Sequence, residues 1–502
     1  MQTVYDICIL GGGIHGAGIA RDAAGRGFSV LLAERGDLGE GAASCGLELL
    51  QGGLRDLEKR RLRQVREALA ERETLLRMAP HVVRPIRLVL PNDRDARPWW
   101  MLRLGLDLYG GLNRKGRLPI PTALKLREAP EGRPLHDRFR RGLAYWDCVA
   151  DAARLVVLNA RSAADLGAAV LVRTAVVRAR RKEGLWRISL RDRNRDARDV
   201  KARVLVNAAG PWADRVFSEV LDRPPRRRFR LIRGSRIVVP ALHAGDQGYA
   251  LQSKDRGIVF VLPFADGFSL IGTAYAAHEG APAETGTDPH EIGALCEAAS
   301  RAFARSVAPG DVRRALAGLW PVTDADPTDL SAMNRRAVIE VEGEREEAPL
   351  VTVAGGAMTL YRRTAEAVLD RLKPWFPSLR PSWTAGVPLP GGNFPDADFA
   401  RFLRGLRQRR PWLPPALSLR YARTYGTRTD ALLEGARSMD DLGRSFGGGL
   451  TEREVSWLVE HEWAAGAEDV LWRRTKLGLH VTAEQRRALA LAMAEAQAPQ
   501  PA

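Results

Sequence analysis

Cysteine is scarce in this sequence, with four residues among 502. Cys8, Cys45, Cys148 and Cys296 stand far apart, without the spacing of a metal site or of a disulfide framework. This pattern excludes a small disulfide-stabilised secreted domain and gives no reason to expect a bound metal. Isolated thiols of this kind are typical of proteins in a reducing cytoplasm.

Long hydrophobic runs and targeting signals are also missing. No apolar stretch approaches the roughly 18 to 20 residues that a membrane-spanning helix needs. The chain begins directly with a strand pattern, so we expect no signal peptide. We therefore expect a cytoplasmic protein, with a peripheral position on the inner face of the cytoplasmic membrane as the alternative.

Acidic residues are outnumbered, because 77 lysines and arginines face 60 aspartates and glutamates, a net charge of +17. An arginine-rich composition, an anionic membrane surface and nucleic acid are the competing explanations. Nucleic acid ranks last, since the arginines are spread along the chain and no nucleic-acid-binding module is recognisable. Residues 98–109 fit an interfacial helix or an ordinary buried helix. Residues 223–230, rich in arginine, are the better candidate for contact with anionic lipid, with a solvated loop as the alternative.

The strongest local pattern lies at the N-terminus. Val4–Leu10 is an apolar run typical of a buried strand, and an alanine-rich helix pattern follows to about residue 25. Between them, Gly11, Gly13 and Gly16 form G-x-G-x-x-G. In a dinucleotide-binding turn the first glycine permits the tight turn. The second lets the backbone approach a pyrophosphate, and the third lets helix and strand pack closely.

An acidic residue follows at the expected distance. A second strand pattern, 28–32, ends at Glu34, eighteen residues after Gly16. A carboxylate there can accept hydrogen bonds from an adenosine ribose, while the N–H groups at the helix start face the phosphates. Strand, glycines, helix, strand and acid in this order favour a bound dinucleotide over a glycine-rich turn that has no ligand.

The sequence after Glu34 fits a flavin better than a nicotinamide. A loop and then a charged helix pattern at 57–78 replace the usual alternation of strands and helices. A β-meander is predicted across 169–190, and a buried strand that stops at small residues follows at 202–210. Only at 350–356 does a strand run into glycines again. We infer two or three domains, with the dinucleotide-binding pieces separated by an insertion.

Short motifs along the chain resemble one known family. In chain order they are residues 5–27, 52–55, 78–81, 147–155, 207–212, 230–235, 257–263, 355–362, 421–426 and 471–476. Together they resemble the aerobic, FAD-dependent glycerol-3-phosphate dehydrogenases, in order and over almost the whole chain.

The resemblance implies an α/β fold of three parts. These are an FAD/NAD(P)-binding Rossmann-like domain built from discontinuous segments, a mixed-sheet substrate domain and a C-terminal helical domain. The implied boundaries are 1–80, 145–220 and 341–385 for the FAD domain, 81–144 and 221–340 for the substrate domain, and 386–502 for the helical domain. The sequence itself predicts a hairpin across 258–272 and helix starts near 440 and 451.

The family's chemistry is implied as well. A hydride moves from a secondary alcohol to flavin N5, and a membrane quinone takes the electrons. The implied substrate is glycerol 3-phosphate or a related polyol, and a homodimer is one open alternative for the oligomeric state. The candidate catalytic residues are Arg55, Arg335 and Tyr361. The candidate cofactor-binding residues are Gly11, Gly13, Ile14, Gly16, Glu34, Ser44, Gly52, Val176, Ala209, Gly210, Gly356, Met358 and Thr359.

The predicted substrate site departs from the family pattern. The replacements are Glu48 and Ala357 for lysines, Trp320 for an arginine, Gln51 and Arg236 for histidines, and Asp56 for a tyrosine. A charge pair at 4 Å is worth about 4 kcal/mol at an effective dielectric constant of 20. We therefore hypothesise an intact flavin site beside an altered phosphate site. A different substrate and a flavoprotein without catalysis are the alternatives.

The group that removes the alcohol proton is also open. Glu48, Asp56 and Tyr361 are candidates, each with a purely structural alternative. None of the eight histidines lies in a matched active-site motif. We expect all of them, including His15 in the glycine turn, to occupy loops or helix faces.

Overall fold

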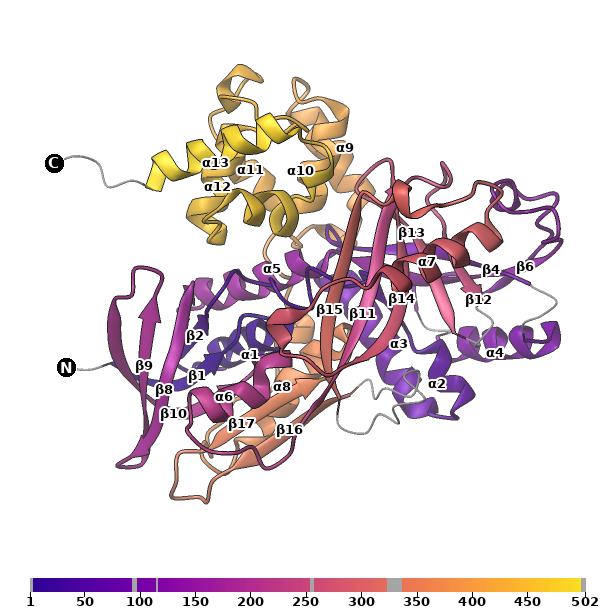
Figure 1. Ribbon diagram of the computed structural model, residues 1–502. Coiled ribbons are helices and arrows are strands. Elements are labelled where there is room, and N and C mark those ends of the chain that lie inside the picture. Colours follow the sequence, from indigo (N-terminus) through magenta and orange to yellow (C-terminus); the bar gives the residue numbers. More distant parts are fainter. Residues whose placement is uncertain (1–2, 93–96, 114–115, 253–256, 323–335, 498–502) are drawn as a thin grey trace.

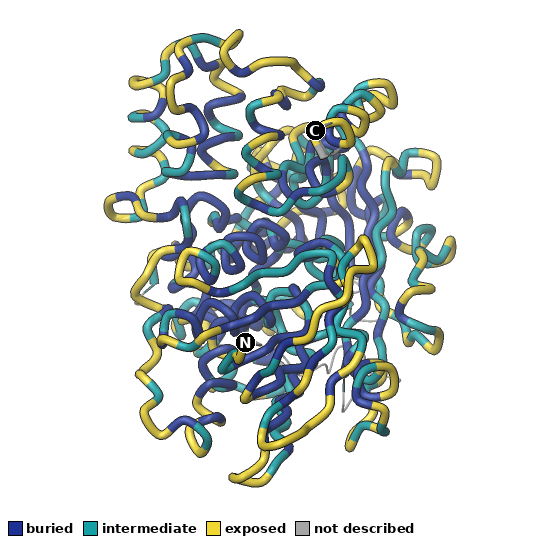
Figure 2. The backbone as a smooth tube through the Cα atoms, turned by 90° about the vertical axis from the view of Figure 1, so that its left-hand side faces the viewer, coloured by how far each residue is buried: buried dark blue, intermediate teal, exposed yellow. Residues whose placement is uncertain are grey.

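The computed structural model describes residues 3–92, 97–113, 116–252, 257–322 and 336–497. Two sheets lie side by side, and a group of helices formed by the C-terminal residues covers one end of them (Figure 1). Buried backbone runs through the interior of both sheets and their helices, whereas the exposed segments are mostly loops at the periphery (Figure 2). The predicted α/β class is confirmed.

The first sheet is parallel at its centre. Its strands, in spatial order, are β17 (Leu350–Gly355), β10 (Ala197–Asn207), β1 (Val4–Leu10), β2 (Val30–Glu34) and β7 (Ala169–Val172), with β16 (Ala337–Glu342) antiparallel at one edge. Successive side chains of a strand point to opposite faces. Ile7 and Ile9 therefore enter one hydrophobic core, and Cys8 and Leu10 enter another. Apolar side chains on both faces are what a parallel sheet covered on both sides requires.

Different elements cover the two faces. Helices α1 (Ile14–Gly25), α5 (Ala152–Asp165) and α8 (Tyr361–Arg371) pack on the first. The hairpin of β8 (Thr174–Lys182) and β9 (Leu185–Asp192) packs on the other with α6 (Ala213–Glu219). The meander predicted across 169–190 is wrong in its first strand, because β7 pairs with β2 in the parallel part. The antiparallel run is β8–β9–β10.

The second sheet is mostly antiparallel. Its strands are β3 (Leu49–Leu50), β4 (Val83–Pro91), β5 (Thr122–Leu124), β6 (Gly142–Ala150), β11 (Arg230–Pro240), β12 (Gly248–Gln252), β13 (Ile258–Phe264), β14 (Phe268–His278) and β15 (Arg314–Val322). The predicted hairpin is confirmed as β13 and β14. The helices that accompany this sheet are α2 (Leu54–Glu58), α3 (Leu62–Met78), α4 (Trp99–Leu112) and α7 (Pro289–Ala302).

The helix predicted at 57–78 is two helices rather than one. The chain leaves the helical path between α2 and α3, where Arg60 has a positive φ of 55°. That conformation is unfavourable for a residue with a side chain inside a helix, so the helix ends there. The break separates the short α2, which follows Gly53, from the amphipathic α3.

Five α-helices and their connecting turns form the C-terminal part within the described residues. They are α9 (Phe399–Arg409), α10 (Pro415–Tyr425), α11 (Thr429–Leu432), α12 (Glu452–Glu462) and α13 (Ala483–Gln497). The helix start predicted near 451 is confirmed, because the Thr451 hydroxyl accepts a hydrogen bond from the Glu454 N–H and caps α12. Near 440 the chain forms only a short 3₁₀ turn, Asp440–Leu442. In the described part of the chain, every helix is too short or too polar to cross a bilayer.

We expect Glu454→Gln to lower the free energy of unfolding of the C-terminal helices by roughly 3 kcal/mol. The Glu454 carboxylate is fully buried and accepts hydrogen bonds from Arg420, at 2.6 and 2.7 Å, and from the Tyr425 hydroxyl, at 2.6 Å. The amide leaves the Arg420 charge without its partner. Urea denaturation followed by circular dichroism measures the change.

Asp430→Asn is the matched control. Asp430 pairs with Arg409 at 3.0 Å, but both side chains are about half exposed. Exposed pairs contribute little, so this variant should stay within about 0.5 kcal/mol of the wild type. Equal losses in the two variants would contradict the assignment of the stability to the buried pair.

Candidate active site

The N-terminal glycine turn joins β1 to α1 with no spare room. Gly11 has a positive φ of 105°, and a Cβ atom there would lie 2.6 Å from the Ala208 carbonyl oxygen. A Cβ atom at Gly16 would lie 1.8 Å from the Gly11 carbonyl oxygen. Both positions therefore exclude any side chain, and their closeness brings the first turn of α1 against the end of β1.

Gly13 has the opposite surroundings. A Cβ atom there would meet no heavy atom within 4 Å, because Gly13 borders a cavity. It is the N-cap residue of α1, no side chain caps the helix, and the first turn contains no acid. The first N–H groups of a helix lack intrahelical partners and carry partial positive charge. This end of the cavity is therefore suited to an anion such as a diphosphate.

Glu34 lies beside the same turn. Its carboxylate accepts hydrogen bonds from the N–H groups of Gly12, at 2.6 Å, and Gly36, at 2.7 Å. Burial raises the pKa of this carboxyl, although the two N–H donors oppose the shift. A carboxylate has about four acceptor sites, so it can still accept hydrogen bonds from ligand hydroxyls. The geometry fits a ribose beside Glu34.

The cavity that these residues border has a volume of about 900 Å³ and is lined by both sheets. Most of the predicted cofactor-binding residues come together in its wall. They are Gly11, Gly13, Ile14, Glu34, Val176, Ala209, Gly210, Gly356, Met358 and Thr359.

The other predicted cofactor-binding residues lie behind the cavity wall. Gly16 is enclosed within the turn, and the Ser44 hydroxyl donates hydrogen bonds to backbone carbonyls of its own loop, including that of Gly39 at 2.9 Å. Gly52 packs against Tyr109, whose hydroxyl would lie 2.1 Å from an added Cβ atom. These three residues shape the wall rather than border the cavity.

Of the three candidate catalytic residues, the structure describes the side chain of Tyr361 alone. Tyr361 is fully buried behind α1, and its hydroxyl accepts a hydrogen bond from the Asn159 side chain at 3.1 Å. Burial raises the pKa of this phenol, and the residue does not line the cavity. Arg335 lies outside the described residues, and so does the side chain of Arg55, whose backbone belongs to α2.

The far end of the cavity contains the residues that depart from the family pattern. Glu48, Gln51, Asp56, Arg236, Trp320 and Ala357 all line it. Hydrogen-bond acceptors and the cationic side chain of Arg236 therefore line the same cavity.

Arg236 is the buried cation of this wall. It is 2% exposed, and its guanidinium lies 4.9 Å from the centre of the Trp320 ring. Nη1 donates hydrogen bonds to the carbonyl oxygens of Cys45 and Gly234, the latter at 3.0 Å, while Nε has no partner. None of the described carboxylates forms an ion pair with Arg236, and burial lowers the pKa of its guanidinium. A buried charge without a counter-ion is costly, so this position favours an anionic ligand.

Sequence reasoning missed two residues at this site. Lys476, from the C-terminal part, forms an ion pair with Glu48 and lies 3.4 Å from Asp151, and burial lowers its pKa to about 7. His15 is not a surface residue of α1, because it lines the cavity and bonds through Nε2 to the Gly355 carbonyl at 2.9 Å. Desolvation lowers the pKa of His15 to about 4. Lys476 ends a motif of the family resemblance, which was the one signal available.

Comparison with known proteins decides the family. A family model described as FAD dependent oxidoreductase matches residues 6–357, and one described as the C-terminal domain of alpha-glycerophosphate oxidase matches residues 382–499. A glycerol-3-phosphate dehydrogenase from Pseudomonas aeruginosa is 45% identical over 97% of this chain and 94% of its own length. The chain belongs to the FAD-dependent glycerol-3-phosphate dehydrogenase family. It is an FAD-dependent oxidoreductase, as the sequence predicts.

Two further relatives cover nearly the full chain. A D-erythritol 1-phosphate dehydrogenase from Brucella abortus is 44% identical over 96% of both chains. The solved structure of the glycerol-3-phosphate dehydrogenase from Bacillus halodurans, in complex with FAD, aligns with a TM-score of 0.77 and 25% identity. That alignment covers 98% of this chain and 90% of the other.

The cavity fits FAD. The open space over Gly13 would accommodate a diphosphate at the start of α1, and Glu34 would accept hydrogen bonds from the adenosine ribose. Met358, Thr359 and Arg236 line the same cavity. FAD, when bound, supplies a hydride acceptor for the reaction.

Two alanine variants separate cofactor binding from folding. Gly13→Ala places its methyl group in the cavity, so the free protein should melt as the wild type does while its affinity for FAD falls by roughly tenfold. Gly16→Ala forces a methyl group against the Gly11 carbonyl, so it should destabilise the free protein by about 1–3 kcal/mol or more. Thermal melting and FAD titration test both. Identical behaviour of the two variants would contradict their different surroundings.

Proposed function

We propose that the protein oxidises a secondary alcohol of a phosphorylated polyol longer than glycerol 3-phosphate and delivers the electrons to a quinone. The observation that carries this proposal is the composition of the far cavity wall. The buried guanidinium of Arg236, which forms no ion pair with a described carboxylate, lines the same cavity as groups that accept hydrogen bonds from hydroxyls. Identity alone does not choose the substrate, because the glycerol-3-phosphate and D-erythritol 1-phosphate dehydrogenases are 45% and 44% identical to this chain.

The charges in the wall disfavour glycerol 3-phosphate. Glu48, Trp320 and Ala357 stand where the family resemblance implies cations, so fewer positive charges face a small phosphate ester. Arg236 replaces part of that charge from another strand and is stacked on Trp320. Losing one partner worth about 4 kcal/mol weakens binding by about a thousandfold. Glycerol 3-phosphate should therefore be a weak substrate.

The acceptors in the wall favour additional hydroxyls. The carboxylates of Glu48 and Asp56 and the amide of Gln51 line the same end of the cavity. Carboxylate and amide oxygens accept hydrogen bonds from the hydroxyls of a longer polyol. Asp56, and Glu48 despite its ion pair with Lys476, are the candidates to take the alcohol proton, since Tyr361 lies behind α1.

The proposal also includes contact with an anionic membrane surface, where a quinone is available. Trp100, Met101, Leu104 and Leu108 follow one side of α4 and are between 38% and 67% exposed. An aromatic and aliphatic helix face on a protein of charge +17 suits the interface of an anionic bilayer.

The basic segment 223–230 is the weaker candidate for this contact. Arg223 and Arg226 pair with Glu342, and Arg227 pairs with Glu340. These two carboxylates offset part of the charge of the five arginines in the segment, and the ion pairs tie three of their side chains to β16.

Anaerobic bleaching of the flavin absorbance tests the reaction. We expect D-erythritol 1-phosphate to reduce the flavin faster than glycerol 3-phosphate does at equal concentration, and free erythritol to be inert. Arg236→Met, which keeps the volume of the side chain, should raise the half-saturating concentration by roughly a hundredfold at unchanged FAD content. Rapid bleaching by micromolar glycerol 3-phosphate would contradict the altered pocket. Failure of every phosphorylated polyol would favour a non-catalytic flavoprotein.

Sedimentation with vesicles of anionic phospholipid tests the membrane contact. The double variant Trp100→Ser, Leu104→Ser should lose most of its binding and keep its flavin spectrum, because it removes the two most exposed side chains of the α4 face. Leu491→Ser is the control, since Leu491 is 59% exposed on α13, in another part of the fold. Equal loss in the control would reject α4 as the specific site.

A further inference from the structure

The loop between β2 and β3, residues 35–48, is a wall of the cavity, and we call it the cover loop. Eleven of its fourteen residues line the cavity. The loop has turns but no helix or strand, and four of its residues are glycines. Glycine-rich segments lose much conformational entropy on ordering, so contacts from the rest of the molecule are needed to hold this wall in one position.

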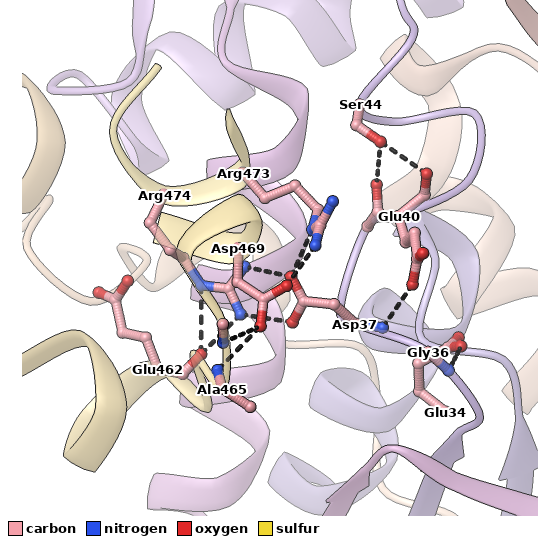
Figure 3. Close-up of polar contacts among 12 residues, drawn as sticks. Glu34, Gly36, Asp37, Glu40, Ser44, Glu462, Ala465, Asp469, Arg473 and Arg474 are labelled. Atoms are coloured by element: carbon pink, nitrogen blue, oxygen red, sulfur yellow. Dashed lines mark hydrogen bonds and ion pairs between the residues drawn. The ribbon is translucent and has the colours of Figure 1, made fainter. Parts of the chain in front are cut away.

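The first sheet and the glycine turn supply some of these contacts. Leu38 is fully buried in the core beneath α1, and the Gly39 N–H donates to the Gly12 carbonyl at 3.1 Å. The Asp37 N–H donates to the Glu40 carboxylate at 2.7 Å within the loop (Figure 3). These contacts hold the backbone near Leu38, but they leave the Asp37 carboxylate buried and in need of a counter-charge.

The C-terminal part supplies that charge. Asp37 is 1% exposed, and its two oxygens accept hydrogen bonds from the Arg474 guanidinium, each at 2.8 Å. Arg473 donates to the same carboxylate, and its other donor is held by Asp469 (Figure 3). Arg474 is itself fully buried and donates to the Glu462 carbonyl at 2.7 Å. Asp37 is therefore held by two arginines, and other residues of the C-terminal part hold each of these arginines in place.

A second contact lies at the other end of the cover loop. Lys476, two residues after Arg474, forms an ion pair with Glu48. Its ammonium group also lies 5.4 Å from the centre of the Phe264 ring on β13. Three residues within the short segment 473–476 of the C-terminal part, Arg473, Arg474 and Lys476, thus bind the cover loop near both of its ends.

We infer that Arg473, Arg474 and Lys476 are positioning residues for FAD: they hold the cover loop against the cofactor and set the rate at which FAD leaves. Removing one partner of a buried ion pair is strongly destabilising, because the other charge stays buried without compensation. Because Asp37 belongs to the wall of the cofactor cavity, removing its partner should loosen that wall rather than the hydrophobic core. This inference rests on the FAD-dependent family and not on the identity of the substrate.

The FAD dissociation rate tests the inference. Asp37→Asn keeps the shape of the side chain and removes the charge that both arginines bind. Holoenzyme is diluted, and the rise in flavin fluorescence on release is followed. We expect release at least tenfold faster than in the wild type, and a smaller increase for Arg473→Met, which leaves the Arg474 contact intact.

Glu454→Gln is the matched control. It disrupts a buried pair of the same C-terminal part that does not contact the cover loop. It should lower the melting temperature without changing the FAD release rate. The inference is overturned if Asp37→Asn releases FAD at the wild-type rate, or if the control releases it as fast as Asp37→Asn does. Lys476→Met at the opposite end of the loop should also accelerate release, and it gives the answer should Asp37→Asn not fold.

Discussion

The close approach of Gly16 to the Gly11 carbonyl is the contact on which the site depends. Because neither residue has a side chain, the first turn of α1 lies directly against the end of β1. That contact aims the unpaired N–H groups of the helix into the cavity and brings Glu34, on the neighbouring strand, to the same place. The second sheet then closes the cavity from the other side. Backbone groups with Glu34 beside them therefore form the dinucleotide end of the site, whereas the substrate end depends on several side chains.

Local sequence patterns predict the backbone at the dinucleotide end of the site, but they do not predict the contacts between distant segments. The strand–turn–helix at the N-terminus and the β13–β14 hairpin are determined by neighbouring residues, so the sequence predicts both. The pairing of β7 with β2 depends on a partner more than a hundred residues away, and periodicity carries no information about it. The sequence does not predict the break at Arg60, because the charged residues on both sides of it favour a helix.

In the candidate site, the sequence likewise predicts which residues line the cavity better than it predicts what their side chains contact. Most of the cofactor-binding residues that the family resemblance implies do line the cavity, because their order along the chain is that of the family. The resemblance gave no direction to the Tyr361 side chain, which packs behind α1. The resemblance also did not predict the ion pair between Glu48 and Lys476, because a sequence motif does not show which distant residues are in contact. Such pairs become visible only when the C-terminal part is seen against the cover loop.

Arginine abundance also has a structural meaning that composition alone did not reveal. Arg154 binds the Glu462 carboxylate from 308 residues away, and Arg72 binds Asp147 at 2.6 Å in the second sheet. Arg21 donates to the Val387 carbonyl at 2.8 Å. All three are buried, so they join separate parts of the fold as well as adding to its net charge.

The separation of Asp37 from Arg473 by 436 residues has a consequence for biogenesis. Domains that form during synthesis do so from the N-terminus onward. The glycine turn is therefore synthesised long before the arginines that neutralise Asp37. On this view, secure capture of flavin must wait until Arg473 and Arg474 have been translated and folded against the cover loop.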